Sequence, residues 1–120
     1  MNTHPIVPAR LWRQGDILIE ECQGLPEGCQ PRPNRIIARG EATGHAHRVK
    51  AFRAAAQLFH PPQRAVRDRN RGLLYLKVSE AGCVISHPEH GPIPLAAGCY
   101  LLWRQREFDP LNGVTRTAGD

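Results

Sequence analysis

GLLYLKVSEAGCVISH, from Gly72 to His87, consists of two short apolar runs separated by Glu80, Ala81 and Gly82. Runs of this length and composition, bounded by turn residues, are typical of β-strands. Gly82 adopts a positive φ without steric cost, which suits the tight turn that the spacing requires. The segment therefore predicts a β-hairpin with strands over 72–79 and 82–87.

The same punctuation continues along the rest of the chain. Proline and glycine divide it into short apolar runs roughly every 8 to 12 residues, a spacing typical of all-β sandwiches and barrels. Further strands are expected over 15–22, 34–41, 45–50, 99–107 and 114–117. Residues 51–58 are too few for a self-supporting helix and are expected to form a wide turn. We predict an all-β fold, a small single-domain β-barrel or sandwich of about seven short strands.

Two of the expected strands indicate which side chains face the core. Along 99–107, Trp103 and its apolar neighbours are expected on the core side. In 45–50, alternation places His45, His47 and Val49 on one face, and Val49 marks that face as the inner one. The two histidines are therefore expected on the inner side of their strand.

Length and composition limit the class of protein. A chain of 120 residues suffices for one domain, which we place over 1–120 with flexible or peripheral ends at 1–12 and 112–120. No apolar run approaches the roughly 20 residues of a membrane helix, and the N-terminus lacks a secretory signal pattern. We therefore expect a cytoplasmic protein with no membrane partner. The chain has no phosphate-binding glycine motif, so no nucleotide cofactor is expected.

The four cysteines form no C-x-x-C pair and are expected to stay reduced. Cys83 and Cys99 lie in apolar strands and are expected in the core. Cys22 and Cys29 flank a Gly/Pro turn and are interpreted as incidental loop thiols. No cysteine is assigned a function.

Four of the six histidines fall into two short groups, His45 and His47 in TGHAHR and His87 and His90 in SHPEHGP. Residues i and i+2 of a strand point to the same side, so two imidazoles can converge on one cation. His87 ends an inward row of its strand, at the point where the strand leaves the sheet. We therefore predict that His45, His47, His87 and His90 are metal ligands.

Three or four imidazole nitrogens with an open position suit a divalent transition metal such as Zn, Fe, Mn or Ni. Such a metal acts as a Lewis acid or lowers the pKa of a bound water, and Glu89 or Glu41 would then be the candidate general base. The alternative is that these are ordinary surface and strand-end histidines, because no H-E-x-x-H or C-x-x-C spacing supports them. The substrate, and whether the protein is an enzyme at all, stay open.

An uneven charge distribution supports a second hypothesis. The net charge is +5, but residues 32–71 carry ten basic and two acidic residues, a local charge of +8, and the rest carries −3. Within this basic segment, Arg64, Arg67, Arg69 and Arg71 have the chemistry to contact phosphates, which predicts a module that binds the RNA or DNA backbone. The excess of fourteen arginines over two lysines is also what a GC-rich genome produces.

A third hypothesis is an accessory interaction subunit without catalysis, which docks a partner through an edge strand or through the segment 104–107. A homo-oligomer is compatible with this reading. The RQRE sequence of the segment alternates arginines with Gln105 and Glu107, as an ordinary solvated strand end also does.

GEATGHAHRV at 40–49 and SHPEHGPIPLAAGCYLLWRQREFDP at 86–110 resemble a family of small, functionally uncharacterised bacterial and phage-encoded proteins. That family carries a TGHxHR segment followed by H-x-E-H-x-P-I-x-L, Gly-x-Tyr and RQRE segments. The likeness runs over most of the chain from Arg13 onward. It implies that the two histidine segments are the hallmark of the family, and it implies no reaction.

The spacing G-x-x-x-x-H-x-H from Gly40 to His47 is also faintly similar to the first motif of the cupins, β-barrels that hold a metal on such histidines. By analogy, this likeness implies metal ligation by His45 and His47. Ala51 and Phe52 stand where the cupin glutamate is expected.

Overall fold

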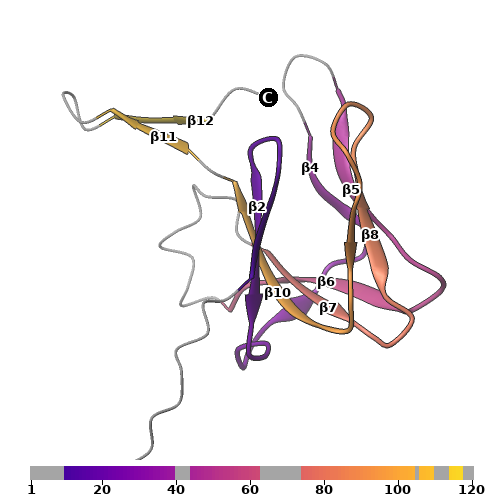
Figure 1. Cartoon of the computed structure of the whole chain (residues 1–120). Coiled ribbons are helices and arrows are strands. Elements are labelled where there is room, and N and C mark those ends of the chain that lie inside the picture. The colour runs from indigo at the N-terminus through magenta and orange to yellow at the C-terminus, as the bar shows by residue number, and fades with distance from the viewer. Residues whose placement is uncertain (1–9, 40–43, 63–73, 105, 110–113, 118–120) are drawn as a thin grey trace, which may run out of the picture.

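The computed structural model describes residues 10–39, 44–62, 74–104, 106–109 and 114–117 (Figure 1), the last two ranges as backbone strands only. These residues form strands, turns and connecting segments, with no helix among them. Accordingly, nothing in the described ranges has the length and apolar character of a helix that crosses a membrane. The predicted all-β class is confirmed.

The larger sheet has six antiparallel strands, in the spatial order β1-β2-β10-β7-β6-β3. They are β1 (Leu11–Gln14), β2 (Ile17–Cys22), β10 (Gly98–Arg104), β7 (Leu74–Val78), β6 (Ala56–His60) and β3 (Gln30–Pro31). β1 and β2 form a hairpin whose turn contains Gly15, with a φ of 60° that glycine adopts readily. Figure 1 shows this hairpin beside β4, β5 and β8 of the second sheet.

The second sheet has four antiparallel strands, in the order β4-β5-β8-β9. They are β4 (Ile36–Arg39), β5 (Ala46–Lys50), β8 (Cys83–Ser86) and β9 (Ile93–Leu95). β11 (Arg106–Asp109) and β12 (Val114–Thr117) pair only with each other, and this ribbon lies apart from both sheets in Figure 1.

The two sheets pack against each other around a single apolar core. Ile19, Leu76 and Leu102 of the larger sheet share this core with Val49 and Ile85 of the smaller one, and none of these side chains is more than 3% exposed. Burial of each such side chain contributes roughly 1.5–3 kcal/mol relative to exposure. The arrangement is sandwich-like rather than a closed barrel, because the sheets keep separate edges.

The prediction of a hairpin over 72–87 is wrong. β7 pairs with β6 and β10, whereas β8 pairs with β5 and β9. The intervening turn, in which the Gly82 N–H donates to the Ser79 carbonyl at 2.8 Å, carries the chain from one sheet to the other. The turn residues were recognised correctly, but a local turn signal does not reveal whether the next strand pairs with the last one or crosses to the facing sheet.

The core face of β10 is also opposite to the expected one. Tyr100 and Leu102 are 2% and 0% exposed and face the core, whereas Cys99 and Trp103 are half-buried on the outer face. Both faces of this strand carry apolar residues, so the largest ring did not identify the inner one. The observed register places Arg104 on the inner face, and its guanidinium donates to the carbonyl of Arg39, at the end of β4, at 3.1 Å.

Several short strands were not anticipated individually. The expected wide turn forms over 52–55, where the Ala55 N–H donates to the Phe52 carbonyl, but β6 starts immediately afterwards at Ala56. β1, β3 and β9 are additional, and β3 and β9 have only two and three residues. Such elements carry too few residues to show a period of two.

Candidate functional site

Four imidazole rings, those of His45, His47, His87 and His90, form a cluster at one end of the sandwich. The centre of the His87 ring lies 4.4 Å from that of His47, 4.5 Å from that of His90 and 5.9 Å from that of His45. The centres of His47 and His90 are 6.1 Å apart. The structure thus brings together the four histidines that the sequence singled out, and we call them the imidazole cluster.

Strand pairing explains why the two histidine groups meet. In the antiparallel pair of β5 and β8, Val49 lies opposite Ile85 and Arg48 lies opposite Ser86. The same register, continued by one residue, brings His47 and His87 to adjacent strand ends. His47 also continues the inner face of Val49 and is 2% exposed.

The side chain of Gln14, at the end of β1, fixes the protonation pattern of His47. Gln14 Nε2 donates to the carbonyls of Ile85 and Gly91, at 3.0 and 2.8 Å. Carbonyls only accept, so the amide cannot be reversed, and Gln14 Oε1 must face His47 Nδ1 at 2.8 Å. His47 Nδ1 is therefore the donor, and Nε2 is the ring nitrogen that faces away from Gln14.

A buried carboxylate lies on the other side of the same ring. Asp16, in the β1–β2 turn, is 4% exposed, and its Oδ1 is 3.6 Å from His47 Nε2. Its Oδ2 forms an ion pair with Nε of Arg104 at 3.0 Å, and this contact from β10 fixes the position of the carboxylate. His47 Nε2 and the Asp16 carboxylate therefore face each other in the same small, buried region.

The turn backbone packs directly against the cluster. A Cβ added to Gly15 would lie 2.8 Å from His90 Nε2 and 3.4 Å from His47 Cε1. Within the described residues, the buried His90 Nε2 has no hydrogen-bond partner. At position 15, only glycine leaves room for the His90 ring in its present position. The buried Nε2 of that ring faces the β1–β2 turn.

The loop after β8 contributes the outer part of the cluster. The backbone N–H of Glu89 donates to His87 Nδ1 at 3.0 Å, so the neutral His87 ring carries its proton on Nε2. The carboxylate of Glu89, 62% exposed, lies 3.2 Å from His45 Nδ1. Of the two candidate general bases, Glu89 thus lies at the exposed rim of the cluster, and Glu41 lies outside the described residues.

The nitrogens of the cluster are not arranged as a finished ligand set. In the part of the chain that the structure describes, no three His, Cys, Asp or Glu side chains have donor atoms placed to hold one metal ion. Two features contribute to this: His87 Nδ1 accepts from the Glu89 backbone, and the rings of His47 and His90 lie nearly parallel instead of turning toward one point. Any ion would require these rings to turn or exchange partners.

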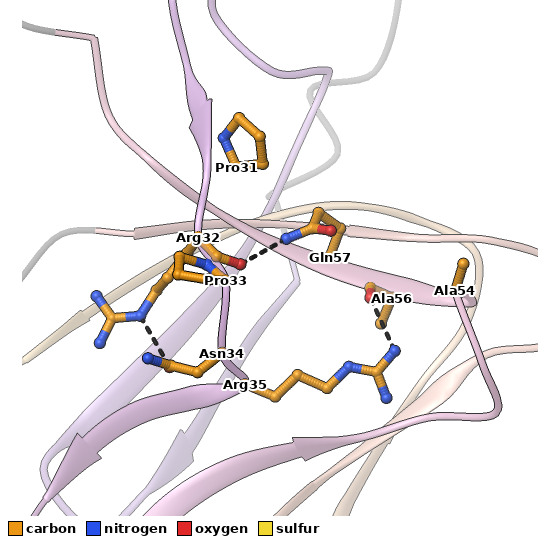
Figure 2. A pocket seen from close by; sticks show the side chains of 8 residues that line it. All are labelled: Pro31, Arg32, Pro33, Asn34, Arg35, Ala54, Ala56 and Gln57. Atoms are coloured by element: carbon orange, nitrogen blue, oxygen red, sulfur yellow. Dashed lines mark hydrogen bonds between the residues drawn. The ribbon is translucent and has the colours of Figure 1, made fainter.

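The structure gives little information on the basic residues of the nucleic-acid hypothesis. Arg64, Arg67, Arg69 and Arg71 lie outside the described residues. Figure 2 shows a surface hollow lined by Arg32 and Arg35, but the Arg35 guanidinium donates to the carbonyls of Ala51, Arg53 and Ala56. Arg35 therefore joins the segment before β4 to the turn before β6, and its donors serve the fold.

Sequence reasoning missed four residues that shape the site, namely Gln14, Gly15, Asp16 and Arg104. Gln14 ends β1, a strand that was not predicted, and Gly15 and Asp16 form the turn between β1 and β2. Arg104 was assigned to the outer face through the incorrect core side of β10. The sequence offered one signal for Asp16, which directly precedes the apolar run of β2. An acidic side chain at such a position is buried with the strand and then needs a polar or charged partner.

Comparison with known proteins extends the sequence findings. No curated protein and no solved structure matches the chain. A family model described as a domain of unknown function, DUF8820, matches residues 13–105, which include the imidazole cluster and the β1–β2 turn. The chain therefore belongs to the DUF8820 domain family.

Proposed function

We propose that this protein binds a divalent transition metal ion at the imidazole cluster, with His47, His87 and His90 as nitrogen ligands and Asp16 beside them. The observation that carries the proposal is the orientation of His47. Gln14 accepts from Nδ1, so Nε2 is the nitrogen left to bind a ligand, and it faces Asp16 Oδ1 across 3.6 Å. A ring nitrogen and a carboxylate oxygen that face each other in a buried place are stabilised by a cation between them.

The ring spacings support three imidazole ligands. Nitrogens about 2.0–2.1 Å from a tetrahedral zinc ion place the centres of their rings about 5 Å apart. The three centres of His47, His87 and His90 are separated by 4.4, 4.5 and 6.1 Å. The spacing of the ring centres is therefore close to that of three ligands, and binding requires the rings, of which those of His47 and His90 are nearly parallel, to turn toward one ion.

Two further features fit a metal centre. A metal-bound histidine normally donates its second ring N–H to a carbonyl or carboxylate, and the Gln14 amide oxygen serves His47 in this way. The buried His90 Nε2, with no hydrogen-bond partner among the described residues, supplies a second nitrogen without breaking a bond. His87 must give up the Glu89 N–H at Nδ1, or move its proton from Nε2 to Nδ1, before one of its nitrogens can bind the ion.

Imidazole nitrogens with one carboxylate oxygen favour Zn, Fe, Mn or Ni over Mg or Ca. An ion here would act as a Lewis acid or lower the pKa of a bound water. Among the described residues, the carboxylate of Glu89 at the exposed rim would then be the general base.

The test is elemental analysis of untagged, gently purified protein, followed by titration of the apo protein with Zn²⁺ and Ni²⁺. We expect about one ion per chain in the wild type and loss of high-affinity binding in His47→Ala/His90→Ala. His60→Ala is the matched control, because His60 is an exposed histidine at the end of β6 outside the cluster. A wild type that takes up neither ion, or a double variant that binds like His60→Ala, would overturn the proposal.

A further inference from the structure

A second group of reactive side chains lies at the other end of β2, away from the imidazole cluster. Cys22 ends β2 and Cys99 is the second residue of β10, and the two are directly opposite each other in the antiparallel register. Both are half-buried and both are free thiols in this structure. The interpretation of Cys22 as an incidental loop thiol leaves out this pairing.

The register places the two residues within reach of a covalent bond. Directly opposed residues of an antiparallel pair have Cα atoms about 4.5 or 5.5 Å apart, depending on their place in the ladder. Disulfides bridge Cα atoms about 4.4–6.8 Å apart. Successive side chains of a strand alternate in direction, so two residues directly opposite each other point to the same face. For Cys22 and Cys99 this is the outer face, because the core face of β10 carries Tyr100 and Leu102.

We propose that Cys22 and Cys99 form a cross-strand disulfide when the protein meets a peroxide. One thiolate attacks the peroxide, an S–O bond forms as the O–O bond breaks, and water leaves after protonation, which gives a sulfenic acid. The second thiolate attacks that sulfur, the S–S bond forms, and a second water leaves. Two thiols are oxidised by two electrons, and one hydrogen peroxide is reduced to two waters.

The surroundings of the four thiols determine which of them react. Burial raises the pKa of the Cys83 thiol to about 11, and Cys83 is on the core side of β8, so it stays protonated and shielded. Burial also raises the pKa of Cys22, with a smaller opposing effect from a backbone hydrogen bond of Gly24. Formation of the disulfide is therefore expected to accelerate as the pH rises above neutrality, because the thiolate is the nucleophile.

Cys29 is the competing partner. It lies in the loop after β2, close enough to Cys22 to influence its ionisation. No strand pairing sets Cys29 opposite Cys22, however, whereas β2 and β10 are neighbours over six residue pairs. The disulfide would thus join the two strands that carry Asp16 and Arg104 near their other ends.

Three double variants separate the pairings. Cys29→Ser/Cys83→Ser retains only Cys22 and Cys99, Cys22→Ser/Cys83→Ser retains Cys29 and Cys99, and Cys83→Ser/Cys99→Ser retains Cys22 and Cys29. Each is treated with hydrogen peroxide at pH 8, and its free thiols and intact mass are measured before and after reduction. Circular dichroism of each variant verifies that it folds.

We expect the first variant to lose both thiols in a monomeric, reducible product, at least tenfold faster than the other two. Wild-type protein should give the same Cys22–Cys99 linkage in a peptide map. A faster reaction in the variant with Cys22 and Cys29, a disulfide between two chains, or oxidation of a folded first variant only to sulfinic and sulfonic acids would overturn the proposal.

Discussion

At the scale of single residues, Gln14 shows how much one buried amide can determine. Its side chain makes three hydrogen bonds, to the Ile85 carbonyl of β8, to the Gly91 carbonyl in the loop after β8 and to His47. It is 2% exposed, so water is a poor substitute for any of these partners. The amide therefore both joins the sheets and selects the tautomer on which the proposed metal site depends.

Gln14→Leu should lower the free energy of unfolding by about 2–4 kcal/mol, because it leaves the buried Ile85 carbonyl, the part-buried Gly91 carbonyl and a buried ring N–H without their partner. Gln57→Leu is the control, since Gln57 is exposed and donates to the Arg32 and Leu58 carbonyls. Its effect should stay within about 1 kcal/mol. Urea denaturation of both variants checks the difference, and equal losses would show that the Gln14 network contributes little.

Gly15→Ala should destabilise the protein through two separate effects. A φ of 60° costs an L-residue about 1–2 kcal/mol, and the new Cβ would lie 2.8 Å from His90 Nε2. In a His90→Ala background only the backbone cost should remain. Gly24→Ala is the matched control, because nothing lies within 4 Å of its Cβ position. Denaturation curves that give Gly15→Ala the same cost in both backgrounds would disprove the contact.

At the scale of elements, the pair of Asp16 and Arg104 links the β1–β2 turn to the end of β10. The two side chains are 6% and 20% exposed, so their attraction is less screened than that of a surface pair. In a double-mutant cycle with Asp16→Asn and Arg104→Gln, we expect a coupling energy of about 1–2 kcal/mol. The pair of His45 and Glu89, whose side chains are 35% and 62% exposed, should give less than about 0.5 kcal/mol in the same measurement. Coupling energies that do not differ would contradict this ranking.

Strand positions could be predicted from sequence far better than strand partners. β2, β5, β7 and β8 carry alternating or bounded apolar runs and lie where these patterns indicated. The partners of β7 and β8 could not be inferred, because the turn at Gly82 suits a hairpin and a crossing between sheets equally. The face of β10 was misassigned because apolar side chains occupy both of its sides.

Sequence predicted only those residues of the candidate site that follow a local pattern along one strand. His45 and His47 share a strand face through a period of two, and His87 continues the face of Ile85. Gln14 and Asp16 join the histidines through long-range packing, for which one sequence holds no periodic signal. The residues that orient the cluster therefore became visible only with the fold.

At the scale of the whole molecule, the proposed metal centre lies where the two sheets meet. The histidines belong to β5 and to the loop after β8, whereas Gln14 and Asp16 belong to the β1–β2 hairpin of the larger sheet. An ion held by ligands from both sides would bind the folded protein and not the unfolded chain. Metal binding should consequently raise the free energy of unfolding of the whole domain.

Zn²⁺ at a hundred times its Kd should raise the free energy of unfolding by about 2.7 kcal/mol, because ligand that binds only the native state shifts the equilibrium by mass action. For a chain of 120 residues this corresponds to an increase in Tm of about 10 °C. Calorimetry of untagged protein checks the shift, which a chelator should reverse and His60→Ala should retain. His47→Ala/His90→Ala should lose it. A shift of the same size in that double variant would place the ion elsewhere on the molecule, and the absence of any shift in the wild type would mean that the cation between His47 and Asp16 is a proton.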